Sequence, residues 1–250
     1  IQIFKGHRAE NVGDADVIVY SSAVKFDNPE IVMARGQQIP LIPRAEALAE
    51  LMRLKRGLAV AGTHGKTTTT SMVASIFLAA NTSPTIVVGG RFDRINSTAL
   101  WGPGEWLIAE ADESDGSFLK LAPEIAIITN IDSDHMDHFK TFENLQKSFQ
   151  DFALKVPFYG AGIVCGDDPE VKKLFQGFSK KIIFYGFENH NDWIVNGSNG
   201  VYQLKGDGQT FNFHLSVSGR HNALNASAAF IAALESGISG QNCIEGLQSF

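Results

Sequence analysis

The amino-acid sequence predicts an α/β protein with a mainly parallel sheet flanked by helices. Between residues 15 and 185, short apolar runs alternate with helical patterns, which is the rhythm of consecutive β-α-β units. Three of the apolar runs end in polar clusters, as expected where parallel strands bring their carboxyl ends to one ligand-binding edge. Residues 192–217 alternate apolar with polar side chains around Asn-Gly and Asp-Gly turns, so we expect a small antiparallel sheet there.

The first part of the chain, residues 1–56, predicts a partial Rossmann-like domain. Strands are expected at residues 15–20 and 39–42, and helices at residues 29–35 and 44–54. Such an order implies parallel strands joined by right-handed crossovers. The sequence opens at Ile1 as though inside a strand, so we expect that the start of this domain is missing.

Residues 57–250 predict a second, larger domain built from longer units. Its expected strands cover residues 58–61, 85–88, 106–109, 124–129, 162–165 and 181–185, and its expected helices cover residues 67–80, 143–154, 219–236 and 241–250. The strand at 58–61 leads through a glycine turn into the helix at 67–80. This strand-loop-helix unit predicts a P-loop domain.

Composition bounds the class of protein. Of the 250 residues, 44% are hydrophobic and 19% are charged, which is typical of a globular chain with a sizeable core. The net charge of −6 argues against a general nucleic-acid or anionic-membrane surface. Cys165 and Cys243 lie far apart without metal-ligand spacing, and no apolar run reaches about 18 residues. We therefore expect buried, reduced thiols and a cytoplasmic protein without a membrane span.

The segment after the strand at 58–61 has the composition of a phosphate-binding loop. Glycines allow backbone N–H groups to surround phosphate oxygens, Lys66 supplies a charge to the β- and γ-phosphates, and Thr67 supplies a hydroxyl to Mg²⁺. Val60 stands where the longer form of this motif has another glycine, so the loop is a shorter variant. A glycine turn with an incidental lysine is the alternative. The candidate nucleotide-binding residues are Gly62, Thr63, His64, Gly65, Lys66, Thr67 and Thr68.

An acidic cluster at residues 110–115 follows the strand at 106–109. Glu110 comes directly after four apolar residues and is therefore expected at the carboxyl edge of the sheet, beside the phosphate loop. A carboxylate there would complete an Mg²⁺ site with Thr67. Charge runs are usually solvated, so an exposed loop is the alternative for the rest of the cluster.

A second polar cluster follows the strand at 124–129. His135 lies among Asp132, Asp134 and Asp137, which suits a divalent ion or a substrate phosphate, although a lone histidine is often structural. Asn130, at the strand tip, is a candidate for hydrogen bonding to a phosphate or a sugar, and it could equally cap a turn.

His221-Asn222-x-x-Asn225 opens the alanine-rich helix expected at 219–236. The amides of Asn222 and Asn225 could recognise an adenine edge, because an amide donates and accepts at once. Asparagine is also a good helix N-cap, so a structural role competes with this interpretation.

Together these motifs resemble the signature segments of the Mur ligase family. The resemblance rests on residues 62–70, 110–115, 129–137 and 221–226, and it extends to residues 6–7 and 21–30 of the first domain. It implies a three-domain, ATP-dependent ligase of peptidoglycan precursor synthesis that activates a carboxylate as an acyl phosphate. His64 and the Ser114-Asp115 ending favour the member that joins L-alanine to UDP-N-acetylmuramic acid.

The resemblance also assigns residue roles. It implies that Lys66, Glu110 and His135 are catalytic, that Thr67, Glu110 and His135 hold Mg²⁺ or Mn²⁺, and that Asn222 and Asn225 contact the adenine of ATP. It places His7 and Ser21 near the UDP-sugar, with Asn130 as a further substrate-binding candidate. The carboxyl-terminal domain of the family is expected to be missing after Phe250.

Three alternatives remain open from the sequence. One is a related ligase with another amino-acid or peptide substrate, such as a murein tripeptide or folate polyglutamate ligase. Another is a nucleotide-dependent switch or transport ATPase, which would need the phosphate loop alone. The last is a fragment that binds nucleotide or UDP-sugar without turnover. The oligomeric state is not predicted.

Overall fold

The computed structural model describes residues 2–134 and 136–250. Contacts divide the chain into two compact units, Ile1–Leu51 and Met52–Phe250. This division lies close to the predicted boundary at residue 56. The roles assigned to the two domains from the sequence stay predictions.

The first unit contains a small β-α-β arrangement. Strands β1 (Ile18–Tyr20) and β2 (Leu41–Pro43) pair in parallel and are joined by α1 (Pro29–Gly36), and helix α2 (Arg44–Arg53) follows. Asn28 caps α1 by accepting a hydrogen bond from the Glu30 amide at 2.9 Å. A 3₁₀ turn, η1 (Ala9–Val12), packs against α1 and was not predicted.

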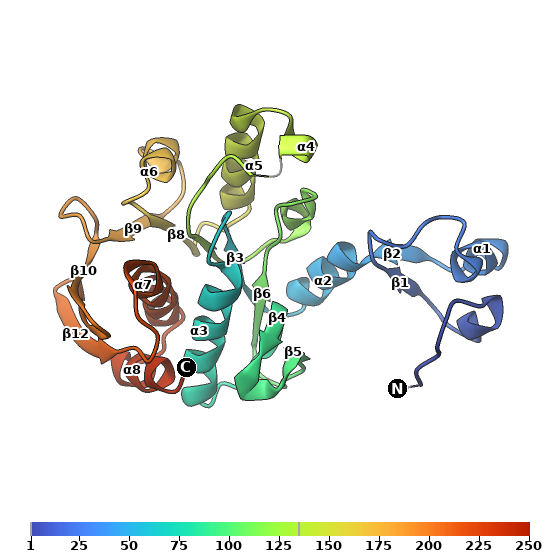
Figure 1. Cartoon of the computed structure of the whole chain (residues 1–250), viewed down its shortest axis with the longest axis horizontal. Coiled ribbons are helices and arrows are strands. Elements are labelled where there is room, and N and C mark those ends of the chain that lie inside the picture. Colours follow the sequence, from blue (N-terminus) through green and yellow to red (C-terminus); the bar gives the residue numbers. More distant parts are fainter. Residues whose placement is uncertain (1, 135) are drawn as a thin grey trace. The chain divides into compact units, whose positions relative to one another are not determined.

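The second unit is built on a ten-stranded sheet (Figure 1). The strands are β3 (Arg56–Ala61), β4 (Thr85–Phe92), β5 (Ser97–Leu100), β6 (Trp106–Glu110), β7 (Ile125–Ile128), β8 (Ala161–Cys165), β9 (Ile182–Gly186), β10 (Trp193–Ser198), β11 (Val201–Gly206) and β12 (Gln209–His214). Their order is β12-β11-β10-β9-β8-β7-β3-β6-β4-β5. Pairing is parallel from β10 through β4 and antiparallel at both margins.

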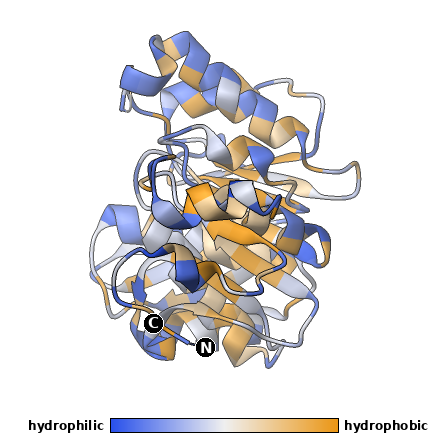
Figure 2. Ribbon diagram, turned by 90° about the vertical axis from the view of Figure 1, so that its right-hand side faces the viewer, coloured by the Kyte–Doolittle hydropathy of each residue, from blue (hydrophilic) through white to orange (hydrophobic). Residues whose placement is uncertain are grey.

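Helices cover the sheet on both faces. Helices α3 (Lys66–Ala79), α7 (Arg220–Glu235) and α8 (Gly240–Gln248) pack together on one face, and α5 (Phe142–Leu154) and α6 (Pro169–Phe175) lie on the other (Figure 1). A short helix α4 (Met136–Phe139) and the 3₁₀ turns η2 (Asp93–Ile95) and η3 (Ser117–Lys120) complete the unit. Hydrophobic residues concentrate on the strands, and hydrophilic residues on the outer helix faces (Figure 2).

The structure confirms the predicted fold class and refines the expected antiparallel sheet. Strands β10–β12 form the predicted meander, but β10 pairs in parallel with β9 through Trp193 and Ile194, so the meander extends the main sheet. Strand β5 was not predicted because all four of its residues are exposed, which leaves no alternation of apolar and polar residues. Helix α6 was also missed, although Asp168 and Pro169 are a recognisable helix start.

Among the residues that the structure describes, no helix is both long enough and apolar enough to span a bilayer.

Candidate active site

Three neighbouring strands end together at one edge of the sheet. Strand β3 lies between β6 and β7, with Val60 opposite Glu110 and Ala61 opposite Ile128. The phosphate loop, the start of the acidic cluster and the Thr129–Asp134 segment therefore leave the sheet side by side. This confirms the expectation that parallel strands gather these polar segments at a single edge.

The phosphate loop depends on two glycines with left-handed backbone angles. Gly62 has φ +128° and Gly65 has φ +83°, and a Cβ atom on Gly62 would lie only 2.1 Å from Thr129 Oγ1. Gly65 stands at the N-cap of α3, so no Cβ covers the first turn of this helix. Both features fit an anion, because backbone N–H groups and the positive end of the helix dipole can approach it closely.

Asn130 holds the phosphate loop from the adjacent strand. Its side-chain oxygen accepts a hydrogen bond from His64 N at 2.8 Å, and its Nδ2 donates to His64 O at 3.0 Å. Thr129 Oγ1 also donates to His64 O, at 2.6 Å. The Asn130 amide is thus engaged in shaping the loop, and its assignment to substrate binding stays a prediction. The His64 imidazole itself is exposed, 3.9 Å from Asp132 Oδ2.

Lys66 is folded back onto the loop. Its ammonium donates to Gly62 O at 2.7 Å, to Thr63 O at 3.2 Å and to Glu113 Oε1 at 2.9 Å. The Glu113 side chain is 1% exposed, and burial raises the pKa of its carboxyl even though the hydrogen bond from Lys66 acts in the opposite direction. The charge of Lys66 is therefore held at the centre of the loop.

Thr67 and Glu110 form the second polar pair of the site. Thr67 Oγ1 lies 3.0 and 2.9 Å from the two carboxylate oxygens of Glu110, and the Gly89 amide donates to Glu110 Oε2 at 2.8 Å. A Cβ atom on Gly89 would lie 2.8 Å from both Glu110 oxygens. A hydroxyl beside a carboxylate is a donor set that suits Mg²⁺, so these residues fit the predicted metal site.

The predicted third metal ligand, His135, lies outside the described residues, and its role stays a prediction. Within residues 2–134 and 136–250, no group of three or more His, Cys, Asp or Glu side chains is arranged to hold a metal ion. Thr67 and Glu110 therefore supply only part of the predicted metal coordination.

Asn222 and Asn225, on the first turns of α7, have different surroundings. Asn225 is 7% exposed, and its Oδ1 lies 2.8 Å from the position that a Cβ atom on Gly65 would occupy. Asn222 Nδ2 donates to Ser218 O at 2.8 Å, a local contact near the helix start. Asn225 thus packs against the phosphate loop, and the predicted contact of both residues with adenine stays untested.

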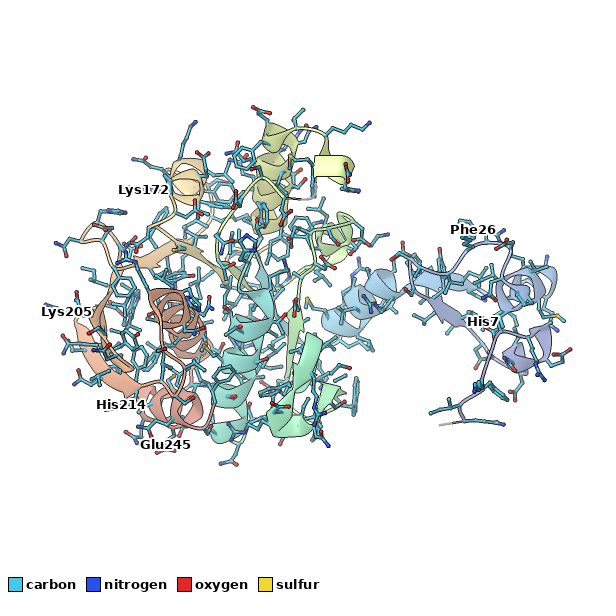
Figure 3. All side chains as sticks on the ribbon, in the orientation of Figure 1. His7, Phe26, Lys172, Lys205, His214 and Glu245 are labelled. Atoms are coloured by element: carbon cyan, nitrogen blue, oxygen red, sulfur yellow. The ribbon has the colours of Figure 1, made fainter. Side chains whose placement is uncertain are left out.

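His7 and Ser21 belong to the first unit, and His7 is labelled in Figure 3. His7 Nδ1 lies 3.0 Å from Glu30 Oε2, and Asn11 Nδ2 donates to Glu30 Oε1 at 2.7 Å. The hydrogen bonds from Asn11 and His7 lower the pKa of Glu30. Ser21 Oγ accepts from the Ala23 amide at 3.2 Å. The predicted contact of His7 and Ser21 with a UDP-sugar stays a prediction.

The sequence did not single out Glu113 or Gly89. Glu113 is one of four carboxylates within six residues, and nothing in the spacing separates it from its exposed neighbour Asp112. Gly89 belongs to a Gly-Gly pair after an expected strand, a signal of close backbone approach that could have been used.

Models of one protein family match both parts of the chain. A family model described as the Mur ligase middle domain matches residues 60–233, and one described as Mur ligase family, catalytic domain, matches residues 1–56. The chain belongs to the Mur ligase family. Membership confirms the resemblance drawn from the sequence motifs.

Individual Mur ligases are similar over the whole chain. The UDP-N-acetylmuramate–L-alanine ligase of Bdellovibrio bacteriovorus is 65% identical, and its counterpart from Nitratidesulfovibrio vulgaris is 50% identical; each alignment covers 100% of this chain. The chain spans 57% and 56% of the length of these two relatives.

Two solved Mur ligase structures have the same architecture. The UDP-N-acetylmuramate:L-alanyl-γ-D-glutamyl-meso-diaminopimelate ligase (MPL) of Neisseria meningitides aligns with a TM-score of 0.86 at 26% identity, covering 99% of this chain and 83% of the other. MurC of Thermotoga maritima aligns with a TM-score of 0.84 at 28% identity, covering 100% of this chain and 58% of the other.

Proposed function

We propose that this protein is an ATP-dependent ligase that joins L-alanine to UDP-N-acetylmuramic acid in peptidoglycan precursor synthesis. The observation that carries the proposal is the meeting of the phosphate loop, Lys66 and the Thr67–Glu110 pair at one sheet edge. The 65% identity to a UDP-N-acetylmuramate–L-alanine ligase supports this choice of substrates. The cytoplasmic location expected from the sequence remains part of the proposal.

The residues of the loop fit the triphosphate of ATP. The Gly62–Gly65 backbone and the first turn of α3 would surround phosphate oxygens, and Thr67 with Glu110 would hold Mg²⁺, with His135 as the further predicted ligand. A bound Mg²⁺ would neutralise charge on the phosphates. Asn222 and Asn225 remain the candidates for contact with adenine.

In the proposed reaction these residues position the reacting groups and offset their negative charge. A carboxylate is a poor electrophile, so the γ-phosphoryl group of ATP moves first onto the carboxylate of UDP-N-acetylmuramic acid to give an acyl phosphate, with ADP as the leaving group. The alanine amine then attacks the acyl carbon, and phosphate leaves. Lys66 offsets the charge that spreads over the transferring phosphoryl group, and the loop fixes its direction. No side-chain nucleophile is required.

The first unit is proposed to bind the UDP-sugar through His7 and Ser21. Asn130, in the second unit, remains a separate substrate-binding candidate. In this arrangement residues 1–56 select the acceptor of the phosphoryl group and residues 57–250 bind ATP. His7 is exposed and paired with Glu30, so its ring can exchange that contact for a phosphate oxygen.

Phosphate release tests the proposal. The protein, expressed over its full reading frame, is supplied with Mg·ATP, UDP-N-acetylmuramic acid and one acceptor at a time: L-alanine, D-glutamate or the murein tripeptide. We expect release with L-alanine that depends on the UDP-sugar. Release with the tripeptide alone would assign the other ligase, and hydrolysis without any acceptor would assign an ATPase.

A further inference from the structure

Among the residues that the structure describes, Glu113 is the only Asp, Glu, Lys or Arg that is buried. It is 1% exposed. Removing a carboxylate from water is costly, so such a group persists only where its surroundings compensate. Glu113 lies inside the candidate active site, yet neither the metal pair nor the contacts of the phosphate loop with Asn130 use it.

The contacts of Lys66 show what Glu113 does. A lysine ammonium has three N–H donors, and here they are directed at Gly62 O, Thr63 O and Glu113 Oε1. Lys66 therefore has to exchange one of these contacts before it can donate to a phosphate. The contact with Thr63 O, at 3.2 Å, is the longest of the three, and its acceptor is an uncharged carbonyl. It is the contact that a phosphate oxygen replaces at least cost.

We propose that Glu113 is a positioning residue for Lys66, retained as its partner when nucleotide is bound. The carboxylate fixes the ammonium within the loop, so that the lysine meets the transferring phosphoryl group in one orientation. The inference rests on the proposed function, since it assigns Glu113 a part in the same phosphoryl transfer.

The placement of Glu113 has two opposite consequences. Its carboxylate contacts the same ammonium group that would contact the phosphates of a bound nucleotide. Its negative charge therefore repels these phosphates and weakens nucleotide binding. The same carboxylate holds Lys66 in place, so it favours the transfer step. Glu113 thus lowers affinity and raises turnover. A residue that served only to stabilise the fold would raise both nucleotide affinity and turnover, or would change neither.

The test uses Glu113→Gln, which keeps the shape of the side chain and removes its charge. Asp112→Asn is the matched control, because Asp112 is the exposed neighbour and its carboxylate accepts a local hydrogen bond from the Ser114 amide at 3.0 Å. Dissociation constants for ADP and a non-hydrolysable ATP analogue are measured by calorimetry, and kcat is measured by phosphate release.

For Glu113→Gln we expect nucleotide to bind roughly tenfold more tightly, the effect of removing one like charge from a partly solvated site. We expect kcat to fall by about tenfold to a hundredfold, the cost of a mispositioned catalytic group. Asp112→Asn should change both quantities less than about twofold, because exposed charges are screened. Unchanged or weaker nucleotide binding by Glu113→Gln would overturn the inference.

A double-mutant cycle with Lys66→Met tests whether Glu113 acts through the lysine. In the Lys66→Met background, Glu113→Gln should cause no further loss of kcat, because there is no ammonium left to position. Fully additive losses would refute the inference. Wild-type protein that neither binds nucleotide nor releases phosphate would instead reject the proposed function, so the two failures are distinguishable.

Discussion

The parallel and antiparallel regions of the ten-stranded sheet use their strand ends differently. In the parallel region, β3, β6 and β7 run the same way and deliver charged and polar groups to one edge. In the antiparallel region, β10–β12 reverse direction at each turn, so their ends are divided between two edges. Parallel pairing thus brings the polar groups at the strand ends together at one edge, and antiparallel pairing divides them between two edges.

The antiparallel region contributes packing instead. Trp193, Tyr202 and Phe213 are buried in the same hydrophobic core cluster as Phe230 of α7, and the rings of Phe213 and Phe230 lie 5.9 Å apart. Polar residues such as Lys205 and His214 face outward (Figure 3). The comparison therefore predicts that changes at the parallel edge affect turnover, whereas changes in the antiparallel region affect stability.

The largest effect is expected from Lys66→Met. Loss of the charge that offsets the transferring phosphoryl group should lower kcat by about 10²–10³-fold, the usual cost of losing one such electrostatic contact. Phosphate release measures the effect. Turnover within a few-fold of wild type would break the comparison, because the parallel edge would then not carry the chemistry.

The stability of Lys66→Met should also depend on pH. Burial raises the pKa of Glu113 above its ordinary value of 4.5, and loss of the opposing hydrogen bond from Lys66 should raise it further. A raised native pKa favours folding below 4.5 and loses that contribution as the pH rises through the native value. Thermal denaturation at pH 5 and pH 8 should therefore show a larger stability loss at pH 8 for the variant than for wild type.

Phe213→Ala tests the antiparallel region. The side chain is fully buried between Tyr202 and Phe230, so its removal should cost about 3–5 kcal/mol of unfolding free energy. Urea denaturation gives the loss, and kcat per folded molecule should remain that of wild type. A selective loss of kcat without loss of stability would contradict the division between the regions.

Two glycines with similar positive φ values, one in each region, allow the parallel and antiparallel regions to be compared at similar backbone strain. Gly65 and Gly208 have φ +83° and +68°, but a Cβ atom on Gly65 would meet Asn225 whereas nothing lies within 4 Å of one on Gly208. Gly65→Ala should weaken nucleotide binding by roughly tenfold as the loop shifts, and Gly208→Ala should cost only about 1 kcal/mol of stability. Calorimetry and urea denaturation separate the two outcomes. Equal effects on nucleotide binding would argue against a special role for the loop.

The smallest effect concerns the two buried thiols, which take no part in the proposed chemistry. Burial raises the pKa of Cys165 to about 11 and that of Cys243 to about 12. At pH 8 about 0.1% or less of each thiol is therefore ionised, and thiol-disulfide exchange with a chromogenic reagent should be slow until denaturant is added. Rapid labelling of the native protein would show that these positions open to solvent.

The sequence by itself determined the local elements and the position of the loop. Apolar runs followed by Gly-Thr-His-Gly-Lys-Thr predict β3, the turn at Gly62 and Gly65, and a helix whose observed span is Lys66–Ala79. The polar clusters after β6 and β7 were located for the same reason. These signals are local, because periodicity and glycine conformation are properties of adjacent residues.

Only the tertiary structure decided which polar residues meet. Glu113 reaches Lys66 across 47 residues, and Asn130 reaches His64 across 66, so neither contact leaves a trace in local periodicity. Within the acidic cluster, Asp112 is exposed and Glu113 buried, although both are carboxylates in the same run. Burial of a single side chain depends on what packs against it from distant segments, and strand order, set by pairing across the whole domain, fixes that neighbourhood.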